Sequence, residues 1–162
     1  YGHAEQGAQK AADVLKRLRY DNATIDEVTT LIRYHDLELP LSCRQWKRLL
    51  NRLGVSLCKK LLAVRRADIL AQNPAFLNRI PDLEKSAQIL QEVVETEACF
   101  SLRDLAVNGK DLIDLGMSPG KNMGILLKEL LQDVIEDRCP NQKEPLLALA
   151  QKKREALLWN KP

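Results

Sequence analysis

The residues best suited to chemistry in this chain form a run of cations without acidic neighbours. Residues 39–67 contain no aspartate or glutamate but eight basic residues. These are Arg44, Lys47, Arg48, Arg52, Lys59, Lys60, Arg65 and Arg66. Because like charge gathered in one segment attracts polyanions, the segment favours contact with nucleic-acid phosphates. Arg44, Arg48 and Arg52 are spaced by four, so they share one helical face, with Lys47 beside them. The alternative is an ordinary solvated helix surface.

A second candidate for anion binding lies near Pro119 and Gly120. These residues predict the start of a helix, where backbone N–H groups lack partners within the helix. Lys121 adds positive charge beside them, and a helix N-terminus of this kind suits a phosphate. Lys110, which follows an Asn-Gly pair, joins the expected RNA-binding residues. The alternative is a tight helix–turn–helix in which the glycines serve close packing.

The elements that position these residues are all predicted to be helices. Leu, Ala, Lys, Arg, Gln and Glu dominate, and aromatic residues make up only 4%, which disfavours an all-β protein. The apolar spacing predicts helices over residues 2–19, 24–36, 42–53, 56–71, 81–98, 101–108, 110–115, 118–138 and 144–159. We expect Thr24 to cap the second helix and Gly54 to end the third. Ser101 should cap a short helix that Asn108 closes, and Ser118 should cap the long helix that follows.

Composition excludes several classes of protein. No apolar run approaches the roughly 20 residues that span a bilayer, and no signal-peptide pattern is present. The four cysteines, Cys43, Cys58, Cys99 and Cys139, lack CxxC spacing, which argues against a zinc ribbon or a thioredoxin-like site. We therefore expect a cytoplasmic protein with free thiols.

The most specific pattern runs from Phe100 to about Gln151. It contains Asp-Leu-Ala-Val-Asn-Gly-Lys-Asp-Leu, then Gly-Met-Ser-Pro-Gly, then a Leu-rich helix beginning near Gly124. This stretch resembles the tail region of bacterial CCA-adding tRNA nucleotidyltransferases and the related bacterial poly(A) polymerases. The matching positions are Asp104, Leu105, Asn108, Gly109, Asp111, Leu112, Gly116, Pro119, Gly120, Gly124, Leu127, Leu130, Leu131 and Val134.

The first half resembles the latter part of an HD-type helical domain. The resemblance rests on Gly2-His3, Gly7-Ala8, His35-Asp36 and Arg66-Ala67-Asp68. HD hydrolases bind a divalent metal through a His, a His-Asp pair and a later Asp, ligands that suit such cations. In the family pattern that His-Asp pair precedes the Gly-His element, so here it would lie upstream of the sequence. His3, His35 and Asp68 would then be a remnant site without metal, and the histidines would be hydrogen-bonded structural residues.

The resemblance implies an all-α protein, with an HD-derived body over residues 1–99 and a helical tail domain over residues 100–162. It implies the tRNA-binding C-terminal part of a tRNA nucleotidyltransferase, which positions the tRNA 3′ end for a catalytic head. The head needs a Gly-Ser motif and paired aspartates that hold two metals, and the sequence has neither Gly-Ser nor Asp-x-Asp. We therefore expect a fragment that uses no cofactor itself, from a parent that uses magnesium with CTP and ATP.

Two other functions stay open at this point. The parent could be an HD-domain phosphohydrolase acting on cyclic phosphates or nucleotides, which an upstream His-Asp pair would indicate. The chain could also be a protein-interaction module, with self-association through apolar helix faces that truncation exposes. The sequence does not distinguish CCA addition from A addition or poly(A) synthesis, because those choices belong to the head.

Overall fold

The structure is a computed structural model that describes residues 2–96 and 98–159. Over these residues the chain has seven α-helices and one 3₁₀-helix and contains no β-strand, which confirms the all-α prediction. The chain divides into two compact units. The first comprises Tyr1–Cys43 and Arg52–Glu92, and the second comprises Arg44–Asn51 and Val93–Pro162. The domain boundary after residue 99 stays a prediction. None of the described helices combines the length and apolar character needed to cross a membrane.

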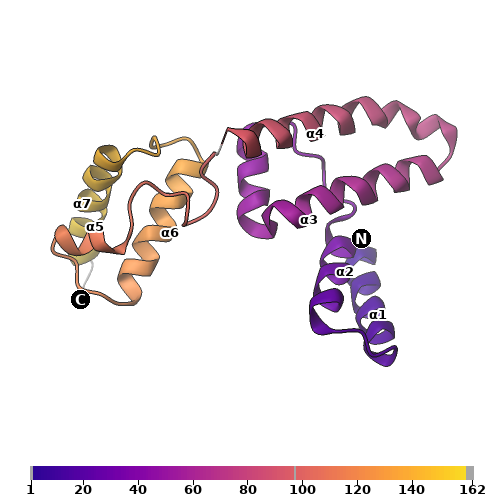
Figure 1. The fold of residues 1–162 in the computed structure, drawn as a ribbon, viewed down its shortest axis with the longest axis horizontal. Coiled ribbons are helices and arrows are strands. Elements are labelled where there is room, and N and C mark those ends of the chain that lie inside the picture. The colour runs from indigo at the N-terminus through magenta and orange to yellow at the C-terminus, as the bar shows by residue number, and fades with distance from the viewer. Residues whose placement is uncertain (1, 97, 160–162) are drawn as a thin grey trace. The chain divides into compact units, whose positions relative to one another are not determined.

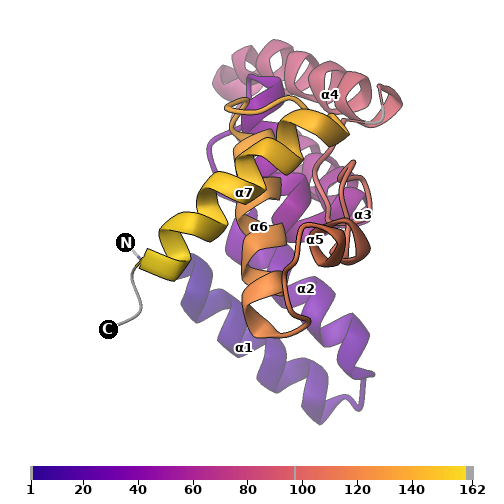
Figure 2. The same ribbon diagram turned by 90° about the vertical axis from the view of Figure 1, so that its left-hand side faces the viewer.

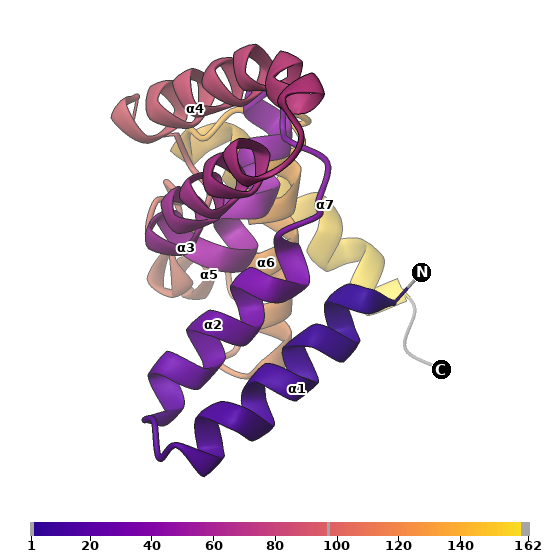
Figure 3. The ribbon, with the colours of Figure 1, turned by 90° about the vertical axis from the view of Figure 1, so that its right-hand side faces the viewer.

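The first unit begins with a helical hairpin formed by α1 (His3–Arg17) and α2 (Asn22–Tyr34) (Figure 3). The two helices run antiparallel and approach closely at Gly7, where a β-carbon would lie 3.3 Å from Ile32 Cγ2. The next residue, Ala8, is fully buried. Asp21 caps α2 by accepting a 2.9 Å hydrogen bond from the Thr24 backbone N–H. The prediction that Thr24 caps this helix is therefore wrong by one turn.

The element α3 (Cys43–Ala71) consists of two helical segments that meet in a kink at Gly54, which confirms the predicted end of a helix at this glycine. Its backbone leaves the helical range at Gly54, with φ 76° and ψ 166°, a conformation that favours glycine. Beyond this kink, α3 runs alongside α4 (Ile80–Glu95) (Figure 1). Arg66 and Glu84 form a 3.6 Å ion pair between the two helices. The 3₁₀-helix η1 (Pro74–Arg79) connects them.

The second unit is built on α5 (Gly109–Asp114), α6 (Lys121–Ile135) and α7 (Lys143–Trp159). Helices α5 and α7 both contact α6 (Figure 2). Its buried core consists of Cys99, Leu105, Val107, Leu112, Leu126, Leu130, Leu131, Val134, Ile135, Cys139, Leu146 and Ala150. The apolar positions of α6 recur three to four residues apart, so they form one buried stripe along that helix.

The short helix predicted over residues 101–108 is absent, and the segment forms turns. The Asp104 carboxylate accepts hydrogen bonds from the backbone N–H groups of Phe100 and Ser101, which satisfies these donors without a helix. Asn108 begins α5 instead of closing a helix, because its side chain and that of Asp111 form a capping box. The long helix α6 is capped by Gly120, so the prediction that Ser118 caps it is also wrong.

Candidate nucleic-acid interface

The C-terminal end of α6 presents two adjacent carboxylates. Glu136 is the C-cap residue, and Asp137 follows it with φ 56°, in the left-handed region that aspartate tolerates better than most residues. The Arg138 N–H closes this helix end with a 2.8 Å hydrogen bond to the carbonyl oxygen of Asp133. The helix thereby ends abruptly and presents both acidic side chains just beyond its last turn.

Three of the four cations predicted on the basic helical face pair with these carboxylates within the second unit. Arg44 Nε lies 3.1 Å from Asp137 Oδ2, and Lys47 Nζ lies 2.8 Å from Asp137 Oδ1. Arg48 forms a bidentate ion pair with Glu136, whose Oε1 lies 2.6 Å from Arg48 Nε. Asn51 donates a 2.8 Å hydrogen bond to the Phe100 carbonyl, which further ties this segment to the second unit.

This pairing changes the electrostatics that the local sequence suggested. Hydrogen bonds from Arg48 lower the pKa of Glu136, and a hydrogen bond from Lys47 lowers the pKa of Asp137 despite partial burial. Both carboxylates therefore stay ionised at neutral pH, and the three cations keep one net positive charge between them (3 − 2 = 1). The side chains of Arg44 and Arg48 remain about half exposed. The acids lie about ninety residues away along the chain, so the sequence of residues 39–67 does not indicate them.

Arg52, the fourth cation of the predicted face, belongs to the first unit. Its guanidinium carbon lies 6.0 Å from the centre of the Tyr34 ring, at the outer limit of a cation–π contact. Such a contact leaves the positive charge un-neutralised. Arg52 therefore keeps the positive charge for which the sequence predicted a contact with RNA phosphates.

The other predicted RNA-binding residues gather at one end of the second unit. A β-carbon on Gly109 would lie 3.2 Å from Met123 Sδ, so the start of α5 packs against the first turn of α6. Lys110 and Lys121 are both exposed beside this contact. The Gly120 cap lacks a side-chain hydrogen bond among the described residues, and a β-carbon there would meet none of their atoms within 4 Å. Close packing thus accounts for Gly109 but not for Gly120.

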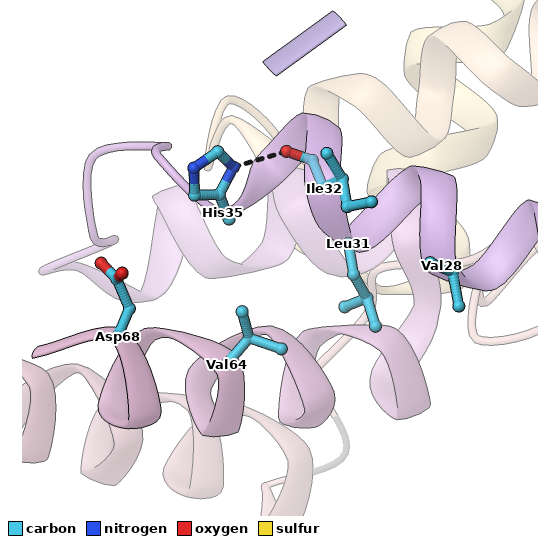
Figure 4. Close-up of a pocket in the computed structure, with 6 residues that line it drawn as sticks. All are labelled: Val28, Leu31, Ile32, His35, Val64 and Asp68. Atoms are coloured by element: carbon cyan, nitrogen blue, oxygen red, sulfur yellow. Dashed lines mark hydrogen bonds between the residues drawn. The ribbon is translucent and has the colours of Figure 1, made fainter. Parts of the chain in front are cut away.

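The remnant HD residues lie in the first unit, where two of the three come together. The rings of His3 and His35 lie 5.5 Å apart, edge to face, and His3 Nε2 lies 3.2 Å from Asp36 Oδ2. His35 and Asp68 line the same apolar pocket of about 360 Å³ (Figure 4). The Asp68 carboxylate accepts a 2.8 Å hydrogen bond from Gln72. The structure therefore joins Asp36, rather than Asp68, to the two histidines.

Comparison with known proteins identifies one family and several relatives. The family model described as tRNA nucleotidyltransferase domain 2, putative, matches residues 3–150. A CCA-adding enzyme of Enterococcus faecalis is 38% identical over 72 residues, which is 44% of this chain and 18% of the relative. A CCA-adding enzyme of Lacticaseibacillus paracasei is 36% identical over 70 residues, which is 43% of this chain and 17% of the relative.

A longer match covers most of the sequence. An A-adding tRNA nucleotidyltransferase of Deinococcus radiodurans is 27% identical over 138 residues, which is 82% of this chain and 30% of the relative. The chain thus spans less than a third of the length of these curated relatives. No solved structure matches it significantly.

Proposed function

This chain belongs to the tRNA nucleotidyltransferase family, and from that premise we propose that it binds tRNA by its phosphate backbone. In the whole protein it would hold the tRNA so that the 3′ end reaches a catalytic head. The relatives are named both CCA-adding and A-adding enzymes, and holding tRNA is the task these names share. The phosphohydrolase alternative has no support, because the matching family and relatives are tRNA nucleotidyltransferases.

The observation that carries the proposal is the pair of helix starts in the second unit. Lys110 and Lys121 stand exposed where α5 and α6 begin side by side, and the start of α6 offers uncapped backbone N–H groups. Fixed N–H donors and two lysines together suit the closely spaced phosphates of an RNA backbone. Gly120 leaves the approach open because it has no side chain, and its φ of 152° favours glycine.

The cluster of Arg44, Lys47 and Arg48 has a more limited role in this proposal. Its carboxylate partners hold the cations in place but reduce their joint positive charge. The exposed N–H groups of Arg44 and Arg48 can still donate to phosphate oxygens, at lower electrostatic gain. Arg52, in the first unit, contributes a positive charge to RNA binding. Its described cation–π contact with an aromatic ring involves no carboxylate.

Nucleotide addition itself is assigned to a catalytic head outside this sequence. The chain lacks the Gly-Ser and Asp-x-Asp motifs that such a head requires, so magnesium, CTP and ATP would bind elsewhere in the parent protein. Cytoplasmic location and self-association through exposed apolar faces are further proposals.

The test compares two charge-reversal variants of the second unit in fluorescence anisotropy with labelled tRNA. Lys110→Glu/Lys121→Glu removes the proposed contacts, whereas Lys128→Glu/Lys152→Glu makes the same charge change at other exposed lysines of that unit. We expect the first variant to bind at least about tenfold more weakly, with a log–log salt slope smaller by about 2. Equal losses in both variants would show a non-specific charge effect and overturn the assignment.

A further inference from the structure

The open end of the α1–α2 hairpin gathers metal-ligand side chains that the proposed function does not use. His3 begins α1, and His35 and Asp36 follow the end of α2, so the antiparallel hairpin brings them together. Each of the three offers a ligand atom, and these atoms lie within 4.8 Å of one another. We propose that His3, His35 and Asp36 bind one divalent transition-metal ion, of the zinc or cobalt class.

His35 is oriented for this role by its backbone contact. Its Nδ1 lies 2.6 Å from the Ile32 carbonyl oxygen (Figure 4). A carbonyl oxygen only accepts hydrogen bonds, so Nδ1 carries the proton and Nε2 keeps its lone pair. Metal-binding histidines commonly hold their second ring nitrogen in this way, which fixes both the tautomer and the ring direction.

Asp36 is oriented by a different neighbour. Its Oδ1 lies 3.5 Å from Arg65 Nη1, and Arg65 also donates a 2.6 Å hydrogen bond to the His35 carbonyl. The other carboxylate oxygen, Oδ2, faces His3 Nε2 at 3.2 Å. A cation would replace the His3–Asp36 contact and bind both groups. The nearby Arg65 opposes a second positive charge, which makes this a weaker site than one with an unpaired carboxylate.

The donor set selects the class of metal. Two imidazole nitrogens and one carboxylate oxygen suit zinc, cobalt or nickel, whereas magnesium and calcium prefer oxygen ligands. Bonds of about 2.0–2.2 Å require the ligand atoms to draw somewhat closer than they now lie. His3 and Asp36 can make this movement because their side chains are 67% and 58% exposed. Water would complete the coordination.

The chain has only two histidines, so a single spectroscopic titration reports on both imidazole ligands. Zinc chloride is added to the metal-free chain, and the two imidazole signals are followed by carbon–proton NMR. We expect both signals to shift together at one equivalent of zinc, with a rise in the melting temperature, and magnesium to shift neither. If the two imidazole signals shift at different zinc concentrations, or if neither shifts with zinc, the proposal is overturned. This test needs only the unmutated chain.

Variants then identify the third ligand. Asp36→Asn should weaken zinc binding by about tenfold or more, as losses around metal sites commonly do. Asp68→Asn is the matched control, because Asp68 lines the neighbouring pocket but lies outside the cluster. The zinc affinity of Asp68→Asn should equal that of the unmutated chain. Equal weakening by both variants, or an effect of Asp68→Asn alone, would reject Asp36 as the ligand. A Cys43→Ser background removes the exposed thiol as a competing site.

Discussion

Lys47 Nζ and Asp137 Oδ1, ninety residues apart in sequence, lie 2.8 Å from each other within the second unit. The Lys47 side chain is only 16% exposed, so most of its surface is already covered in this arrangement. Arg44 shares the same carboxylate, and Arg48 pairs with the neighbouring Glu136. The two acids thus offset part of the positive charge of Arg44, Lys47 and Arg48. Without them, this cluster would be the strongest positive patch expected from the sequence.

Neutralising both acids should therefore strengthen RNA binding. In Glu136→Gln/Asp137→Asn the three cations lose their carboxylate partners, and their joint charge rises from one to three. We expect tighter binding of tRNA and a steeper dependence of the binding constant on salt, both measured by anisotropy. The matched control is Glu38→Gln/Asp82→Asn, which makes the same charge change at exposed acids of the first unit. A similar gain in the control would assign the effect to net charge alone.

Arg52 and Arg44 should respond differently to charge reversal. Arg52→Glu removes a cation that contacts the Tyr34 ring, whereas Arg44→Glu places a new carboxylate beside Asp137. We expect both to weaken binding of every tRNA tested, because phosphate contacts carry no sequence information. We expect only Arg44→Glu to lower the melting temperature clearly, through like-charge repulsion. Unchanged affinity in both variants would remove the basic face from the interface.

Local patterns predicted the longer helices well because apolar periodicity reports directly on a buried face. The break at Gly54 was also predictable, since glycine alone suits its φ of 76°. The start of α5 was misassigned although its signal was present. Asn108 and Asp111 have the spacing of a capping box, but the Asn-Gly pair suggested a helix end.

The candidate site was less predictable because its geometry depends on contacts distant in sequence. Nothing within residues 39–67 indicates that Glu136 and Asp137 neutralise part of the basic face. Similarly, the adjacency of Asp36 and His3 follows from the α1–α2 hairpin rather than from either residue's neighbours. The family resemblance, by contrast, was readable at sequence level because glycines, prolines and capping residues carry it.

A buried carboxylate should make stability depend on pH. Burial alone would raise the pKa of Asp133, but the hydrogen bond from Arg138 and the ion pair with Lys153 outweigh it and lower this pKa in the folded chain. A carboxyl group whose pKa is lower in the folded than in the unfolded chain stabilises the fold at pH values above its unfolded-state pKa. This stabilisation is lost as the pH falls through the folded-state pKa. We expect the melting temperature to fall as the pH drops below about 4.

Replacing this carboxylate should flatten the pH profile. Asp133→Asn should lose about 1–2 kcal/mol of unfolding free energy at pH 7, because Arg138 and Lys153 lose a charged partner. The difference from the parent chain should shrink at low pH, where the parent carboxylate is protonated as well. Asp114→Asn, at an exposed position of α5, is the control. Urea unfolding at several pH values measures both, and parallel pH profiles for the parent and Asp133→Asn would contradict the role of this group.

Two glycines of the same region should respond to alanine with opposite signs. Gly120 has φ 152° and ψ −170°, where a side chain is strained, so Gly120→Ala should destabilise the chain by about 1–3 kcal/mol. Gly124 lies inside α6, and a β-carbon there meets none of the described atoms within 4 Å. Gly124→Ala should therefore stabilise α6 by about 0.5–1 kcal/mol, since alanine loses less backbone entropy in a helix. Urea denaturation of the two variants distinguishes these outcomes. Destabilisation by Gly124→Ala would reveal a neighbour at this surface, whereas a neutral Gly120→Ala would show that the start of α6 adopts another backbone conformation in solution.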